Sequence, residues 1–120
     1  MAQFKSGFEN ITHVKADVTQ NLGTSTTVTA NGVRGKLTLT IDGAIANNNV
    51  GGAFTFNNSF IEADSMVNLM TNSVDTDYKI PVIPSAYNIS AGSCSVKFTN
   101  ITGQAIVDNS VIGLAYEIIN

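Results

Sequence analysis

Charged side chains are scarce in this sequence, where Asp, Glu, Lys and Arg make up 12% of 120 residues, about half of the usual share of roughly 25%. Asn, Thr and Ser take their place, in runs such as Thr24–Thr27, Asn47–Asn49 and Asn57–Ser59. Hydroxyl and amide groups bind water but lose it at a lower cost than charges do. A surface of this kind suits contact with other protein. The composition therefore favours a structural or binding module over a catalyst.

Basic residues are also few: six Lys and Arg stand against nine Asp and Glu, and the formal net charge is −3. Binding to a nucleic-acid backbone needs clustered cations. The scattered cations and the acidic balance argue against nucleic acid as a partner.

Cysteine and histidine occur once each, as Cys94 and His13. A single cysteine excludes an internal disulfide. One cysteine and one histidine are also too few ligands for a zinc site built mainly from these two residue types. A Ser/His/Asp or Cys/His catalytic arrangement would have to use His13, which stands in an ordinary polar context. Cys94 lies between two serines in an alternating run, so we expect it to pack as a small apolar residue. We expect no metal or cofactor.

Long hydrophobic runs are absent. No apolar stretch of the length of a signal peptide follows Met1, and no window approaches a membrane span. We therefore expect synthesis in the cytoplasm without a signal peptide, and no membrane partner. The length predicts a single domain.

Strand patterns fill most of the chain. Lys36–Asp42 alternates strictly, which places Leu37, Leu39 and Ile41 on one face. The Thr-rich run Thr24–Ala30 ends at Asn31-Gly32, a strong turn signal. We expect these two runs to form a hairpin or neighbouring strands.

Further strands and loops follow from the same reading. Strands are expected at Ala53–Asn57, Ser65–Thr71 and Cys94–Thr99, loops at Asn47–Gly52 and Asn72–Tyr78, and an edge strand at the proline-containing Ile80–Pro84. Short strands separated by polar turns predict an all-β fold, an antiparallel β-sandwich or barrel of seven to nine strands, of which a jelly roll is one form.

The last run, Ser110–Ile119, is apolar on both faces. Ile112, Leu114, Tyr116 and Ile118 form the face expected in the core. The other face consists of Val111, Gly113, Ala115 and Ile119 and is interrupted by Glu117. A strand that is apolar on both sides is covered on both sides. A loop or another subunit must therefore cover this second face, and the face is the main indication in the sequence of a subunit interface.

Three groups of side chains are weaker candidates for chemistry. Glu62 and Asp64 could form an acid–base pair of a glycan hydrolase, and Asp75 and Asp77 could bind a cation, although the spacing of an EF-hand is missing. Tyr78 and Tyr87 could offer a platform for a sugar. A solvated loop, or packing against the proline segment, explains these residues as well.

The order of the segments resembles a module of bacteriophage virion proteins. The residues that carry the resemblance are Thr19-Gln20, Thr24–Thr29, Gly35–Leu39, Phe54–Ile61, Ala91–Val96 with Asn100, and Val111–Ile119. Together they span Asp17 to Ile119, so the resemblance implies a single β-sandwich domain over residues 17–120, preceded by an N-terminal arm or first strand over residues 1–16. The resemblance implies a β-sandwich, commonly trimeric and exposed on a virus particle after synthesis in the host cytoplasm.

A chain that carries this module alone is most similar to a capsid decoration, or cement, protein. Such proteins bind the major capsid protein on the outer surface of the shell. The resemblance therefore implies a non-enzymatic homotrimer that stabilises the virion, with Phe4, Lys5 and Phe8 of the arm as capsid contacts. A receptor- or glycan-binding module of a tail or fibre tip, and a small glycan hydrolase, remain the alternatives.

Overall fold

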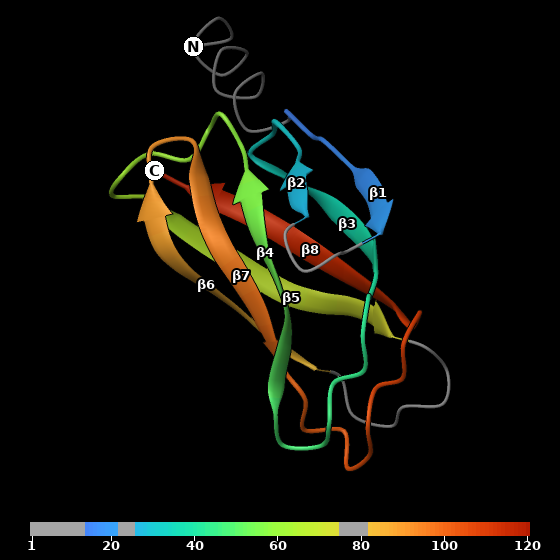
Figure 1. Cartoon of the computed structure of the whole chain (residues 1–120). Coiled ribbons are helices and arrows are strands. Elements are labelled where there is room, and N and C mark those ends of the chain that lie inside the picture. Colours follow the sequence, from blue (N-terminus) through green and yellow to red (C-terminus); the bar gives the residue numbers. More distant parts are fainter. Residues whose placement is uncertain (1–13, 22–25, 75–81) are drawn as a thin grey trace, which may run out of the picture.

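Alternating apolar and polar residues form eight strands in the part of the chain that the structure, a computed structural model, describes: residues 14–21, 26–74 and 82–120 (Figure 1). The strands are β1 (Val18–Asn21), β2 (Thr27–Thr29), β3 (Arg34–Thr40), β4 (Val50–Asn57), β5 (Met66–Val74), β6 (Ile83–Ser90), β7 (Ser93–Thr99) and β8 (Val111–Ile119). These residues contain no helix, so the expected all-β class is confirmed. Phe4, Lys5, Phe8 and His13 lie outside the described residues.

Two four-stranded sheets pack face to face. Sheet 1 has the strand order β1-β3-β8-β5 and sheet 2 the order β2-β4-β7-β6. Both sheets are mixed, because β1 pairs with β3 and β2 with β4 in parallel, while the other pairs are antiparallel. The expectation of a purely antiparallel fold is therefore wrong at one edge of each sheet. Only β6 and β7 follow each other within one sheet, so most sheet neighbours are distant in sequence and a parallel pair can arise.

The expected pairing of the strands around Asn31-Gly32 is also wrong. β2 belongs to sheet 2 and β3 to sheet 1, and residues 30–33 carry the chain between the sheets. The Asn31 side-chain oxygen accepts a hydrogen bond from the Ser59 amide at 3.0 Å, and the Gly32 carbonyl accepts one from Asn58 Nδ2 at 2.7 Å. The Asn-Gly pair thus makes long-range bonds in place of a two-residue hairpin.

Two expected loops are partly strand. β4 begins at Val50 and contains Gly51 and Gly52 at a β-bulge, where a side chain on Gly52 would start 2.7 Å from the ring of Phe98. β5 continues to Val74, beyond the predicted end at Thr71. The expected edge strand is confirmed from residue 83 onward, because Pro84 lies in β6 at the edge of sheet 2.

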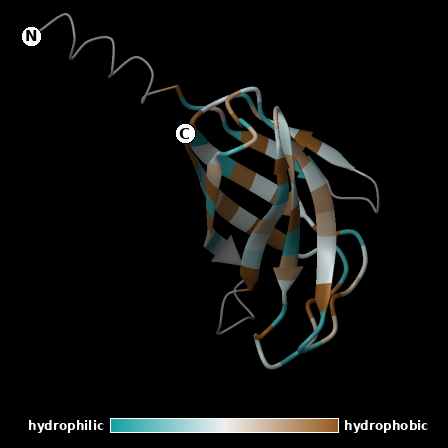
Figure 2. Cartoon of the chain, turned by 90° about the vertical axis from the view of Figure 1, so that its left-hand side faces the viewer, coloured by the Kyte–Doolittle hydropathy of each residue, from teal (hydrophilic) through white to brown (hydrophobic). Residues whose placement is uncertain are grey.

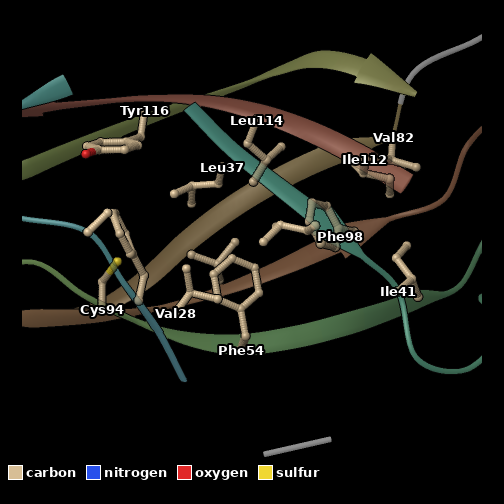
Figure 3. Packing of buried hydrophobic residues seen from close by; sticks show 14 of the residues in the cluster. Val28, Leu37, Ile41, Phe54, Val82, Cys94, Phe98, Ile112, Leu114 and Tyr116 are labelled. Atoms are coloured by element: carbon tan, nitrogen blue, oxygen red, sulfur yellow. The ribbon is translucent and has the colours of Figure 1, made fainter. Parts of the chain in front are cut away.

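The core lies between the sheets. Figure 2 shows hydrophobic and hydrophilic bands alternating along the strands, and in Figure 3 side chains of β3 and β8 point towards those of β4 and β7. The largest fully buried side chains are Phe56, Phe98, Leu37, Leu39, Ile41, Ile61, Ile106, Ile112 and Leu114. The predicted inward faces of β3, β4, β7 and β8 are confirmed, and the ring of Phe56 meets that of Tyr116 edge-on at 5.0 Å between centroids.

A side-chain hydrogen bond links the two sheets at each margin. At one side Thr71 Oγ1 of β5 donates to the carbonyl of Val82 at 2.6 Å. At the other side Gln20 Nε2 of β1 donates to the carbonyl of Thr27 at 2.8 Å. Because these bonds connect a strand of sheet 1 with a segment at the edge of sheet 2, they close the sandwich on both sides.

Candidate interaction surface

The outward side chains of sheet 1 form rows across β3, β8 and β5. We call this surface the outer face of sheet 1. Its rows, read from the strand register, are Ile119 and Met66; Arg34, Glu117 and Asn68; Lys36, Ala115 and Met70; Thr38 and Gly113; and Thr40 and Val111. Each row joins residues that are distant in sequence, so the composition of the face depends on the sheet order.

Large apolar side chains are exposed on this face. The exposed fractions are 60% for Met66, 65% for Met70, 40% for Ile119 and 38% for Val111. Scattered exposed apolar residues are common, but a contiguous apolar patch bordered by polar residues marks a contact site. Methionine is adaptable in such contacts because its side chain is unbranched and polarisable.

Two neighbouring depressions on this face have Ala115 and Tyr116 in common among their lining residues. One has a volume of about 410 Å³ and is lined by Asn68, Leu69, Met70, Ala115, Tyr116 and Glu117. The other has a volume of about 280 Å³ and is lined by Lys15, Arg34, Gly35, Lys36, Ala115 and Tyr116. The small side chain of Ala115 lies between the longer Met70 and Lys36 of its row, and the face is therefore hollow at its centre.

The predicted interface residues of β8 lie where the sequence places them, with one exception. Val111 and Ile119 are exposed, Ala115 is half-buried, and Gly113 is buried. The interface itself stays a prediction. Sequence reasoning missed Met66 and Met70, although each lies two residues from the outward Asn68 in β5 and therefore on the same face; that spacing was the available signal.

The β1–β3 side of the same face is charged. Lys15, Arg34 and Lys36 are three of the six basic residues of the chain, and they line the smaller depression together. Lys15 Nζ lies 3.6 Å from a carboxylate oxygen of Asp17, while the other oxygen of Asp17 accepts a hydrogen bond from the Lys36 amide at 2.8 Å. Both side chains of the Lys15–Asp17 ion pair are about half exposed, so this pair contributes little to stability.

Tyr116 helps to hold residues 14–16 against β3, next to the charged side of the face. Its hydroxyl donates to the Ala16 carbonyl at 2.7 Å. Residues 14–16 also run along β3, since the Val33 amide donates to the Val14 carbonyl and the Ala16 amide to the Arg34 carbonyl. Burial, followed by the nearby negative charge of Asp17, raises the pKa of Tyr116 to about 12. The hydroxyl therefore remains a donor at neutral pH.

The weaker candidates receive no support from their surroundings. Glu62 and Asp64 are exposed in a turn and line neither depression. Tyr87 is 37% exposed, and Lys97 Nζ lies over its ring, 5.0 Å from the centroid, where a sugar would stack. Asp75, Asp77 and Tyr78 lie outside the described residues.

Within residues 14–21, 26–74 and 82–120 there is no group of three or more potential metal-ligating His, Cys, Asp or Glu side chains, and no helix is long and apolar enough to span a membrane.

Alkaline pH is expected to destabilise the fold through two buried groups. Burial raises the pKa of Cys94 from its ordinary 9.0 to about 11, and that of Tyr116 from 10.0 to about 12. Both groups are neutral when protonated, so the folded state binds their protons more tightly than the unfolded state does. Stability is therefore complete below about pH 9 and falls as pH rises through the two folded values.

Urea titrations between pH 7 and pH 12 would measure this loss of stability. The variant Cys94→Ala should lack the part of the decline that starts near pH 9, while the later part remains. Identical pH profiles for the two proteins would show that the thiol is not protected by burial. In the native protein at neutral pH, Cys94 should also resist alkylation, because the thiolate is the nucleophile.

Comparison with known proteins finds no match for this chain among protein-family models, curated proteins or solved structures.

Proposed function

We propose that this chain is a non-enzymatic structural protein of a bacteriophage virion, a homotrimer that binds the major capsid protein and stabilises the outer surface of the capsid. One observation carries the proposal: the large apolar side chains of Met66, Met70 and Ile119 are exposed on the outer face of sheet 1 in a single chain. A soluble protein covers such a face by association. The resemblance of Asp17–Ile119 to the virion module is the reason for proposing a bacteriophage capsid as the assembly that covers this face.

The physical requirements of a capsid clamp agree with the rest of the surface. A clamp adds binding energy between shell subunits and catalyses nothing, so it needs wide contact faces in place of a cleft. The outward side chains of β7, in sheet 2, are mostly small and polar: Ser93, Ser95, Lys97 and Thr99. Attachment through three subunits raises the overall affinity without strong individual contacts.

The proposal includes a jelly-roll-like arrangement and an N-terminal capsid contact. Consecutive strands alternate between the sheets except at the β6–β7 hairpin, which supports such an arrangement. Residues 14–16 pair with β3, so the part of the arm proposed to reach the shell precedes Val14. Phe4, Lys5 and Phe8 are the proposed contacts with the shell.

The copy number of the protein in purified particles tests this function. A number of the same order as that of the major capsid protein is expected, and particles stripped of the protein should lose resistance to heat or osmotic shock. A few copies confined to the tail would contradict capsid decoration and favour the receptor- or glycan-binding module. The hydrolase alternative would need a measured activity that is lost in Glu62→Ala or Asp64→Ala.

A further inference from the structure

The outer face of sheet 1 is polarised, and this limits how two copies can meet on it. Its cations, Lys15, Arg34 and Lys36, lie on the β1–β3 side, whereas Met66 and Met70 lie on the β5 side. The face carries a net charge of +1 when Asp17 and Glu117 are included, which leaves −4 on the remainder of a chain with net charge −3. The remainder of a second copy is therefore acidic on average.

Two-fold stacking of this face on itself is unfavourable when the axis runs either across the strands or along β8. In an isologous contact the same patch serves both subunits. A two-fold axis that runs across the strands would place the three cations against their own copies. An axis along β8 would place the cations over the methionines of the partner and Glu117 over its own counterpart. Like charges at a contact cost free energy, and so do cations buried against apolar side chains.

A different patch of the same chain complements the face. At the far end of the sandwich, Val107 is 59% exposed near two carboxylates, those of Asp42 and Asp108. The two loops that carry them are joined, because Asp108 Oδ1 accepts a hydrogen bond from the Gly43 amide at 2.8 Å and the Asn109 amide donates to the Ile41 carbonyl. We call Asp42, Val107 and Asp108 the acidic tip. These loops follow the end of β3 and precede the start of β8, and β1 runs in parallel along the last residues of β3 towards them, with Asn21 opposite Thr40.

The acidic tip cannot reach the charged depression of its own chain. Asp42 follows Lys36, the cation of that depression nearest to it along β3, by six residues, which corresponds to roughly 20 Å at the usual rise per residue of a strand. The two patches are therefore available to different copies only. A contact between two different patches is heterologous, and it generates a closed ring when the rotation between neighbours closes.

We infer that the acidic tip of one copy docks into the outer face of sheet 1 of the next copy, with Val107 over Ala115 and the carboxylates beside Lys36 and Arg34. The inference rests on the self-association in the proposed function and names its contact. Lys36 is a suitable probe of the contact, because its side chain is exposed at the centre of the face, in the row of Ala115. Asp42 is a suitable counterpart, because it is exposed while Asp108 holds the Gly43 amide.

A charge-swap experiment on the full chain tests the contact. The mass in solution would be measured by light scattering over a range of protein concentrations for the wild type, Lys36→Glu, Asp42→Lys and the double variant. Each single reversal should raise the half-assembly concentration by about tenfold or more, as expected for a reversed interfacial charge pair. The double variant should return to within about threefold of the wild type, because it restores opposite charges.

Lys97→Glu is the matched control, since it reverses a cation on the outward side of sheet 2 and should leave assembly unchanged. Circular dichroism of each variant confirms that it is folded. The contact would be overturned if the two single variants assembled at the concentration of the wild type, or if the double variant needed as high a concentration as the single variants. Either result would leave the capsid role intact. A wild type that stays monomeric at high concentration would overturn both the contact and the homotrimer, and a low copy number on particles would remove the capsid role alone.

Discussion

Replacement of Asn100 by alanine is expected to lower the free energy of unfolding by about 3 kcal/mol, because four hydrogen bonds of a buried side chain are lost and each contributes about 0.5–1.5 kcal/mol. Asn100 is fully buried. Its Nδ2 donates to the carbonyls of Ile45 at 2.9 Å and Gln104 at 2.8 Å, and its Oδ1 accepts from the Thr102 amide at 2.9 Å and from Thr102 Oγ1 at 2.7 Å. Alanine removes all four bonds and leaves a cavity.

The effect of Asn100→Ala would be measured by urea unfolding at a fixed protein concentration, since assembly shifts the apparent stability. Asn49→Ala is the matched control. Asn49 is exposed, and its carbonyl accepts the hydrogen bond from the Asn100 amide at 2.9 Å, a bond that alanine keeps. The control should change stability by no more than about 0.5 kcal/mol. A similar small change for Asn100→Ala would show that the loops are held without its side chain.

A methyl group at position 35 is expected to be equally damaging, for a steric reason. A Cβ on Gly35 would lie 1.9 Å from the Ala16 carbonyl oxygen and 2.8 Å from the Tyr116 hydroxyl. Ala16 cannot easily yield, because its amide donates to the Arg34 carbonyl and its carbonyl accepts from Tyr116. We expect Gly35→Ala to cost about 3 kcal/mol and to separate residues 14–21 from β3.

Hydrogen exchange, combined with urea unfolding, would detect this separation as faster exchange of the amides that join β1 and β3. Gly43→Ala is the control, because position 43 has space for a methyl group but a backbone conformation that alanine disfavours. Gly43 has a φ of +94°, and a methyl group there would meet no atom within 4 Å, so alanine should cost about 1 kcal/mol through backbone strain alone. If Gly35→Ala were no worse than Gly43→Ala, the packing of Ala16 against β3 would not contribute to stability.

Strands whose pattern repeats locally were predictable. β3 and β7 alternate over seven residues, and such a pattern specifies the buried face without knowledge of the neighbouring strand. Pro84 indicated an edge strand for the same local reason, since proline has no amide hydrogen to donate. The single cysteine was correctly expected to be buried.

Pairings between distant segments were not predictable. Asn31-Gly32 is a local signal for a hairpin, but its side-chain and carbonyl groups bond to Ser59 and Asn58, which lie 28 and 26 residues further along the chain. Likewise, β5 was expected to end at Thr71, whereas it continues along β8 through a bulge to Val74. In both cases long-range hydrogen bonds and packing outweigh the local preference.

The candidate interaction surface was likewise predictable only in part. The two apolar faces of β8 can be read from Val111–Ile119 alone, because side chains alternate along any strand. That Met66 and Met70 join this surface on one side, and Lys36 and Arg34 on the other, depends on the order β3-β8-β5. No local pattern encodes that order.

By itself, the sequence determined the all-β class, the inward residues of the regular strands and the second apolar face of β8, since each follows from the period-two geometry of an extended chain. Only the tertiary structure decided the mixed sheets, the depressions over Ala115 and the separation of the acidic tip from the cations. The reason is that these features are made by neighbours across strands and sheets, which come together only when the whole sandwich packs.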